Sequence, residues 1–323
     1  MKAIVRDGYG PPEALQIREV PDPRPKEGEL LIRVHATSVN SWDWDVLVGT
    51  FLGRLGARKT PRHAVIGGDL SGIVVGVGPG VTRFRPGDAV FGDLTSANWG
   101  GFAELAAGPE TYFAPKPEGL SFVEAATIPQ AGGLALQALR KRPIGPGSRV
   151  LVNGAGGGAG SFAVKLAKHA GAEVTGVDSA MKQDFIRGIG ADRALDYAAT
   201  DYTATGDRYD LIVDLVANRP LSSYARALAP GGALAVIGGT PRTLLKIATL
   251  GSLRSLVGGK AYRLVIWRPR PAEFTELAAL AISGAVRPAI DTVYPLPRTG
   301  EALRKLGDGK TLGKVVVAVA GGT

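Results

Sequence analysis

The stretch "LVNGAGGGAGSFAVKLAKHAGAEVTGVDSAMK", residues 151–182, decides the fold. Five of the seven residues from Gly154 to Gly160 are glycine, and they stand between an apolar run and a helical pattern. Glycines spaced G-x-x-G-x-x-G in this context permit a tight turn and let backbone N–H groups approach a pyrophosphate. The N-terminus of the following helix adds partial positive charge toward that anion. The loop therefore predicts a dinucleotide site rather than a glycine-rich turn without a ligand.

Strands and helices alternate from this loop onward. The predicted strands cover 149–153, 173–177, 209–215 and 233–239, and the predicted helices cover 157–170, 180–189 and 219–228. This alternation predicts a doubly wound parallel sheet built from βαβ units.

The remaining parts of the chain have other patterns. Residues 1–118 consist of short apolar or alternating runs between Pro- and Gly-rich turns, which predicts a β-rich part. Residues 121–141 predict a helix whose middle is interrupted by Pro129 and Gly132-Gly133. The pattern weakens over 241–270. It then predicts a helix over 271–283, a strand over 289–295, a helix over 299–308 and a strand over 314–320.

Two residues after the second strand of the parallel sheet have opposite implications for the cofactor. Asp178 stands at the position where an acidic residue hydrogen-bonds the ribose 2′-OH of NAD. Lys182, with Ser179 nearby, suits the 2′-phosphate of NADP instead. Each residue also has a simpler role, because an acid there caps a helix and a lysine there is solvated. The residues by themselves leave NADH and NADPH open.

The composition limits the classes of protein to consider. The 323 residues suffice for two domains with packed cores. The absence of cysteine excludes disulfides, thiolate chemistry and cysteine-ligated zinc. No apolar run approaches the roughly 20 residues of a membrane-spanning helix, and charge and Pro-Gly come too early for a secretory signal. We therefore expect a cytoplasmic protein that does not bind membranes.

The charge balance is 38 − 29 = +9, which favours anionic partners. The basic residues are scattered, with only short clusters such as 140–142. The dense basic stripe that is typical of nucleic-acid binding is missing, so phosphorylated small ligands are favoured over nucleic acid.

Several blocks of the chain together resemble the medium-chain dehydrogenase/reductase superfamily, and its zinc-independent quinone oxidoreductase branch in particular. They include "MKAIVRDGYGPPEALQIREV", "GVGPGVTRFRPGDAVFG", "GADRALDY", "LAPGGALAVIGG" and "LGKVVVAV". The resemblance implies a Rossmann-type domain over 119–264 and a β-rich GroES-like catalytic domain over 1–118 and 265–323. It also implies a homodimer formed by sheet extension, with 241–262 near the interface or the rim of the active site.

The zinc alcohol dehydrogenases of this superfamily use a cysteine, a His-Glu pair and a lobe of four cysteines. In this sequence Asn40 stands at the cysteine position and Gly68-Asp69 stand at the His-Glu pair. The three histidines lie on separate predicted elements without ligand spacing; they are His35, His63 and His169. Resemblance and composition thus agree in predicting neither a catalytic nor a structural zinc.

The quinone oxidoreductase pattern Asn-x-x-Asp is matched by Asn40 and Asp43. The resemblance implies that these catalytic residues hydrogen-bond around the reacting ring or substrate, with a polar turn after a strand as the alternative role. In the same branch a lysine and a tyrosine commonly hold the 2′-phosphate, and Lys182 and Tyr197 match them. NADPH is therefore favoured, although Asp178 replaces a residue that is usually neutral, and NADH stays open.

The residues expected to contact the cofactor lie in the glycine loop and near the ends of the later strands. They are Gly154, Ala155, Gly156, Gly157, Gly158, Ala159, Gly160, Asp178, Ser179, Lys182, Tyr197, Val216, Ile237 and Gly238. The residues expected in the substrate pocket depart from the family pattern or flank Asp43, and they are Trp42, Trp44, Gln130 and Leu134. Core packing is the alternative role for the two tryptophans.

A site without zinc ligands has no Lewis acid, so hydride from the nicotinamide suits an acceptor that spreads its own negative charge. We therefore expect an NADPH-dependent reductase of quinones or α,β-unsaturated carbonyls. Asn40 is the expected donor to the developing oxyanion, and Tyr112 or water is the expected proton source. Two alternatives remain: a biosynthetic enoyl reductase-like enzyme, and a dinucleotide-sensing or RNA-binding protein without catalysis.

Overall fold

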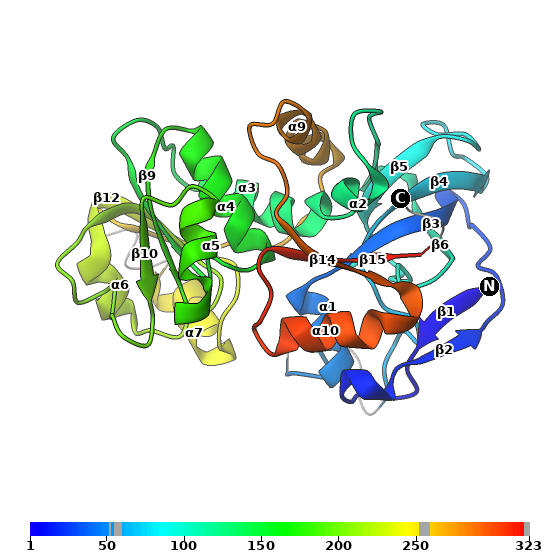
Figure 1. The fold of residues 1–323 in the computed structure, drawn as a ribbon, viewed down its shortest axis with the longest axis horizontal. Helices are drawn as coiled ribbons and strands as arrows, with labels where there is room; N and C mark the ends of the chain where they lie inside the picture. The colour runs from blue at the N-terminus through cyan, green and yellow to red at the C-terminus, as the bar shows by residue number, and fades with distance from the viewer. Residues whose placement is uncertain (52, 55–59, 252–258, 320–323) are drawn as a thin grey trace. The chain divides into compact units, whose positions relative to one another are not determined.

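The computed structural model describes residues 1–51, 53–54, 60–251 and 259–319. The chain forms two compact units (Figure 1). The first unit consists of Met1–Gly133 with Arg268–Thr323, and the second consists of Leu134–Trp267.

The second unit contains a six-stranded sheet in which all neighbouring strands are parallel. Its strands are β8 (Arg149–Asn153), β9 (Glu173–Asp178), β10 (Arg193–Asp196), β11 (Tyr209–Asp214), β12 (Leu228–Val236) and β13 (Ala261–Leu264). Their spatial order is β10-β9-β8-β11-β12-β13. Strands β9 and β10 thus lie on one side of β8, and strands β11 to β13 lie on the other side. The predicted doubly wound sheet is confirmed.

The strands of this sheet form where the sequence is continuously apolar. Val150, Leu151 and Val152 of β8 are fully buried, as expected for a parallel strand that is covered on both faces. The helices between the strands are α4 (Gly158–His169), α5 (Gln183–Gly188), α6 (Leu221–Ala227) and α7 (Pro241–Lys246). A further helix, α3 (Gly133–Leu139), precedes β8.

Helix α4 shows how local sequence sets these boundaries. It begins after Gly157, which has an extended backbone, and it buries a face that includes Ala163 and Leu166. It ends at His169, and Gly171 follows in the left-handed region with φ 84°. Glycine is favoured there because it lacks the Cβ that makes this conformation costly.

The first unit is built on antiparallel strands. A two-stranded sheet pairs β1 (Lys2–Val5) with β2 (Gln16–Glu19). A seven-stranded sheet contains β3 (Glu29–Val39), β4 (Asp69–Val77), β5 (Ala89–Asp93), β6 (Leu105–Pro109), β7 (Phe113–Pro115), β14 (Ile290–Pro295) and β15 (Lys314–Ala318). The last two strands are parallel to each other, and β15 pairs antiparallel with β3. The C-terminal segment thus completes the sheet that the N-terminal segment begins.

The helices of the first unit are α1 (Ser41–Val48), α2 (Phe122–Ala125), α9 (Pro271–Ile282) and α10 (Thr299–Gly307). Helices α1 and α10 contact each other and share a core with β15. Short 3₁₀ turns cover Pro12–Ala14, Glu110–Tyr112 and Leu296–Arg298 in this unit, and Ala180–Lys182 in the second.

The helix predicted over 121–141 is broken into three pieces: α2, a π-helical turn over Ile128–Gly132, and α3. Pro129 lies in the π turn, and a proline within a helix removes one backbone donor. The first two pieces contact strands of the first unit. Ser71 Oγ donates to the Phe122 carbonyl oxygen of α2 at 2.6 Å, and the Gln130 N–H of the π turn donates to Asp69 Oδ1 at 3.0 Å. The first unit therefore extends to Gly133, beyond the predicted boundary at 118.

The weakly patterned segment 241–270 begins with α7 and a π-helical turn over Ile247–Gly251, and it includes β13. Part of this segment, 252–258, lies outside the described residues. Within the described ranges, no helix is long and apolar enough to cross a membrane.

Candidate functional site

The glycine loop connects β8 to α4 and brings the helix very close to its strand. Gly154 has φ 88°, which allows the chain to turn directly after Asn153. A Cβ atom at Gly160 would overlap the carbonyl oxygen of Gly154, and one at Gly156 would lie 2.5 Å from Cδ of Lys182. Small residues are thus required here, and the backbone of the loop can approach a pyrophosphate as a dinucleotide site demands.

Asp178, Ser179, Lys182 and Tyr197 lie together at the ends of β9 and β10. The Asp178 carboxylate accepts the N–H of Gly156 at 2.9 Å and that of Ser179 at 2.8 Å. Lys182 Nζ lies 3.5 Å from the same carboxylate, and the Lys182 side chain is buried. The Tyr197 N–H donates to the Asp178 carbonyl oxygen at 3.1 Å, while the Tyr197 side chain is 57% exposed. Acid and base therefore form an ion pair beside the glycine loop.

The other predicted cofactor residues lie at the carboxyl ends of β11 and β12. The Ile237 N–H donates to the Asp214 carbonyl oxygen at 2.8 Å, and the Ala217 N–H donates to the Gly238 carbonyl oxygen at 2.9 Å. Val216 lies between Asp214 and Ala217 in the sequence, and its side chain is half exposed. The structure thus brings the loops after β8, β11 and β12 to one edge of the sheet.

In the first unit, Asn40 is the centre of a buried polar cluster. Its Nδ2 atom donates to Asp69 Oδ2 at 2.9 Å, and its Oδ1 atom accepts from Lys314 Nζ at 2.6 Å. A lysine can only donate and a carboxylate accepts, so these two partners fix which way the Asn40 amide points. The Nδ2 atom carries a second hydrogen besides the one on Asp69.

Asp43 supports this arrangement through backbone contacts. Its carboxylate accepts the N–H of Asn40 at 2.7 Å and the N–H of Gly68 at 3.1 Å. It lies in the first turn of α1 and is fully buried. Asp43 therefore holds the start of α1 and the chain before β4 in place.

Burial sets the protonation of the charged members of this cluster. Burial, with the nearby charge of Asp69, raises the pKa of Asp43 to about 7, against the opposing hydrogen bonds from Asn40 and Gly68. Burial also raises the pKa of Asp69 and lowers the pKa of Lys314, although these two groups lie 3.6 Å apart and each favours the charged form of the other. For both pKa values, the effect of desolvation is thus larger than that of the ion pair.

Gln130 belongs to the same cluster through its backbone as well as its side chain. The Gln130 N–H donates to Asp69 Oδ1 at 3.0 Å, and its Nε2 atom lies 3.4 Å from Asp93 Oδ2. The side chain of Asp93 favours the charged form of Asp69, against the larger effect of burial.

Sequence reasoning did not single out Asp93 or Lys314, and it used Asp69 only to argue against zinc. Lys314 carried a usable signal, since it is a lone lysine at the start of the apolar run "KVVVAVA". Lysine is almost never fully buried unless it is paired, so a lysine that begins an apolar strand is a candidate for a buried pair.

The other predicted pocket residues lie elsewhere. Trp42 packs on the core cluster between α1, α10 and β15. The ring of Trp44 lies against Gly307 of α10, and the Arg304 guanidinium stands 5.7 Å from its centre. Both tryptophans thus make packing contacts in the first unit, and their place in a substrate pocket stays a prediction. Leu134 lies in α3 at the start of the second unit.

Tyr112, the alternative to water as a proton source, ends a 3₁₀ turn before β7 and packs on a second core cluster of the first unit.

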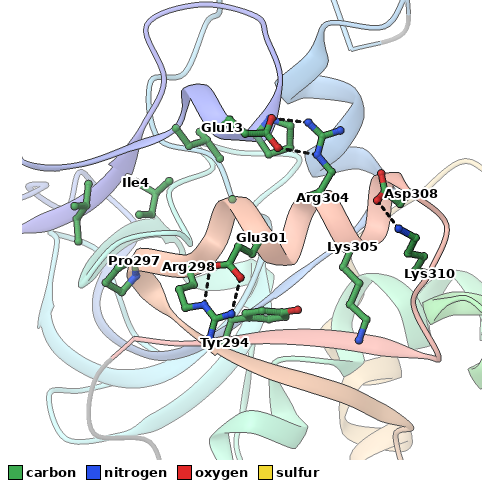
Figure 2. Close-up of a pocket in the computed structure, with 14 residues that line it drawn as sticks. Ile4, Glu13, Tyr294, Pro297, Arg298, Glu301, Arg304, Lys305, Asp308 and Lys310 are labelled. Atoms are coloured by element: carbon green, nitrogen blue, oxygen red, sulfur yellow. Dashed lines mark hydrogen bonds and ion pairs between the residues drawn. The ribbon is translucent and has the colours of Figure 1, made fainter.

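A cavity of about 610 Å³ lies between α10 and the β1–β2 segment of the first unit (Figure 2). Six of its charged side chains are paired with one another: Arg304 with Glu13, Arg298 with Glu301, and Lys310 with Asp308 (Figure 2). The seventh, Lys305, pairs with Asp291, which does not line the cavity. The described residues that line it include none of the predicted site residues.

Among the residues that the structure describes, no group of three or more His, Asp or Glu side chains is arranged to hold a metal ion.

The raised pKa of Asp43 predicts a pH-dependent stability. The folded state retains a proton on Asp43 up to about pH 7, whereas the unfolded chain loses it near pH 4. The contribution of Asp43 to stability therefore falls as pH rises between these values, by up to about 4 kcal/mol. In denaturant unfolding, Asp43→Asn should show a flatter pH dependence than the unaltered chain over pH 4–7. A constant stability difference between the two proteins across this range would contradict the assignment.

Known families and proteins match both units. A family described as "Alcohol dehydrogenase GroES-like domain" matches residues 26–118, and one described as "Zinc-binding dehydrogenase" matches residues 189–317. The chain is 32% identical to the chloroplast envelope quinone oxidoreductase homolog of Arabidopsis thaliana, covering 98% of each chain. It is 31% identical to the 2-methylene-furan-3-one reductase of Solanum lycopersicum, covering 98% of this chain and 79% of the relative.

Among solved structures, the quinone oxidoreductase from Coxiella burnetii matches with a TM-score of 0.88 and 27% identity, covering 99% of both chains. This similarity extends over both units and agrees with the relatives found by sequence. The chain therefore belongs to the quinone oxidoreductase branch of the medium-chain dehydrogenase/reductase superfamily, a family of nicotinamide-dinucleotide-dependent oxidoreductases.

Proposed function

We propose that this protein reduces quinones or α,β-unsaturated carbonyl compounds with hydride from NADPH, without a zinc ion. The proposal rests on one feature of each unit: a dinucleotide loop in the second unit and a fixed amide donor, Asn40, in the first. Two relatives support the substrate class by their names, since one is named a quinone oxidoreductase homolog and the other a reductase of 2-methylene-furan-3-one, a conjugated ketone. The enoyl reductase-like alternative fits these names less well.

The amide of Asn40 suits an oxygen that gains negative charge. When bound, the cofactor supplies a hydride, and a conjugated acceptor then places the incoming charge on its oxygen. Asn40 Nδ2 has one hydrogen on Asp69 and a second one to donate, and Lys314 polarises the amide from its oxygen side. A preorganised donor of this kind stabilises charge that develops in the transition state. Asp43 serves as a positioning residue, because it holds the Asn40 backbone.

The cofactor preference rests on the residues around Asp178. We propose that Lys182, Ser179 and Tyr197 hold the 2′-phosphate of NADPH. The Asp178 carboxylate already accepts two backbone N–H groups and faces Lys182 at 3.5 Å, so its charge is partly offset before a phosphate arrives. NADH is the competing ligand, because the same carboxylate can accept a ribose hydroxyl.

Substituting Lys182 tests the cofactor preference. Lys182→Ala removes the cation and leaves Asp178 to repel a phosphate, so the dissociation constant for NADPH should rise by about 10- to 100-fold. The constant for NADH should stay within about twofold, since NADH lacks that phosphate. Both are measured by fluorescence titration.

Lys168→Ala is the matched control for Lys182→Ala, because Lys168 also pairs with an aspartate, Asp192, in the same unit. If Lys182→Ala weakened the binding of NADPH and NADH equally, the lysine would not recognise the 2′-phosphate.

Turnover assays test the reaction and the role of Asn40. The protein should oxidise NADPH with quinones and conjugated ketones but not with saturated ketones. Asn40→Ala should lower kcat/KM for the acceptor by about 100-fold, as expected for loss of an oxyanion donor, without weakening NADPH binding.

Ser38→Ala is the control for Asn40→Ala, because Ser38 also donates to the Asp69 carboxylate, at 3.2 Å, from a fully buried position. An equal loss of kcat/KM in the two variants would place the effect in the cluster as a whole and not in the Asn40 amide.

We also propose that the chain forms a homodimer through the edge of the second unit's sheet. Strand β13 is an edge strand there, and exposed apolar side chains near it in sequence include Leu245, Leu250 and Ile266. Sedimentation equilibrium should give the mass of two chains, and a monomer at micromolar concentration would contradict the proposal. The cytoplasmic location stays a prediction.

A further inference from the structure

The carboxylate of Asp214 is buried and accepts hydrogen bonds from four separate groups. Oδ1 accepts from Asn153 Nδ2 at 2.9 Å and from the Val216 N–H at 3.0 Å. Oδ2 accepts from the Tyr224 hydroxyl at 2.8 Å and the Tyr202 hydroxyl at 3.3 Å. The four donors come from β8, the loop after β11, α6 and the turn after β10. One side chain thus ties together four segments of the second unit.

Asp214 lies where the order of strands reverses. It ends β11, and in the sheet it stands directly opposite Asn153, which ends β8. Strands β8 and β11 are the two central strands, and later strands are added on opposite sides of this pair. In open parallel sheets, the ligand binds in the crevice at the carboxyl ends of two such strands. The carboxylate therefore lies beneath the loops that border this crevice.

The loops around the carboxylate pack backbone to backbone. The Leu215 N–H donates to the Asn153 carbonyl oxygen at 3.0 Å, directly before Gly154. A Cβ atom at Gly238 would lie 2.6 Å from the Leu215 carbonyl oxygen. The position of the glycine loop and that of the loops after β11 and β12 are therefore interdependent, and a shift in one displaces the others.

We infer that Asp214, together with Asn153, Tyr202 and Tyr224, forms a positioning network that holds the loops after β8 and β11 in the arrangement that binds the dinucleotide. The inference rests on the proposed function, because it assigns a role in binding that function's cofactor. The network touches loop backbone and no reacting atom, so its members are positioning residues. Its effect is preorganisation: loops that are already ordered lose less conformational entropy when the ligand binds.

The chemistry of the network fits this role better than a role in stability alone. A buried carboxylate costs desolvation energy that an apolar side chain would avoid. Burial and the nearby charge of Asp214 hold the pKa of Tyr202 and Tyr224 well above the usual range, so both hydroxyls remain donors. Four directed bonds specify one arrangement of the loops, which non-directional apolar packing cannot do.

Removing a single donor tests the inference in the full-length chain. Tyr224→Phe deletes one hydroxyl and keeps the ring in the core. Tyr209→Phe is the control, because it also deletes the hydroxyl of a buried tyrosine, but one that begins β11, at the other end of the strand from Asp214. Among the described residues the Tyr209 hydroxyl has no hydrogen-bond partner. Each protein is titrated with whichever of NADPH or NADH the unaltered chain binds more tightly. Asp214→Asn serves as a stronger variant if it folds.

Tyr224→Phe should raise the cofactor dissociation constant about tenfold, and Tyr209→Phe should leave it within about twofold. Without cofactor, amide hydrogen exchange over Asp214–Ala217 should be faster in Tyr224→Phe only, because the Val216 N–H bonds to the loosened carboxylate.

Two results would overturn the inference in different ways. Equal dissociation constants for Tyr224→Phe and Tyr209→Phe, with exchange unchanged, would show that the network only supports the core. No binding of NADPH or NADH by the unaltered chain would overturn the proposed function and the inference with it.

Discussion

Helix α4 packs so closely on strand β8 that no side chain fits between them at Gly160. Any Cβ atom there would overlap the carbonyl oxygen of Gly154, so the close approach depends on glycine. This contact sets the position of α4 against the centre of the sheet of the second unit. The other strands are then added on either side of β8, and the ends of β8, β11 and β12 meet at one edge. The dinucleotide loop is thus a packing constraint as well as a binding surface.

Each unit also buries a carboxylate that orients its neighbours, but the two carboxylates are compensated differently. Asp69 faces a cation, Lys314, and both contact the two ends of the Asn40 amide. Asp214 faces neutral donors, two hydroxyls, an amide and a backbone N–H. A cation stabilises charge over several ångströms, whereas neutral donors act only along their bonds. The first arrangement therefore suits the polarisation of an amide, and the second suits the fixing of loops.

Local sequence patterns predicted most of the fold. The strand and helix of the glycine loop lie where they are predicted, because apolar runs, glycines and capping residues act within a few positions of each other. The predicted helix over 121–141 is broken, because Pro129 interrupts it and because Phe122 and Gln130 bond to Ser71 and Asp69, far away in sequence. The hydrogen bonds of Asp214 with Tyr202 and Tyr224 have no counterpart in the sequence pattern, since spacing along the chain does not reveal such contacts.

The sequence by itself determined the doubly wound sheet, the dinucleotide loop and the family, because turn chemistry, periodicity and blocks of similar residues are properties of short segments. It also pointed to Asn40, Asp43, Asp178 and Lys182. Only the tertiary structure decided what surrounds them: that Lys314 orients the Asn40 amide, that Asp43 holds backbone N–H groups, and that Asp178 and Lys182 form a buried pair. These roles depend on burial and on contacts between distant segments, because desolvation and hydrogen-bond geometry are set only when the chain is folded.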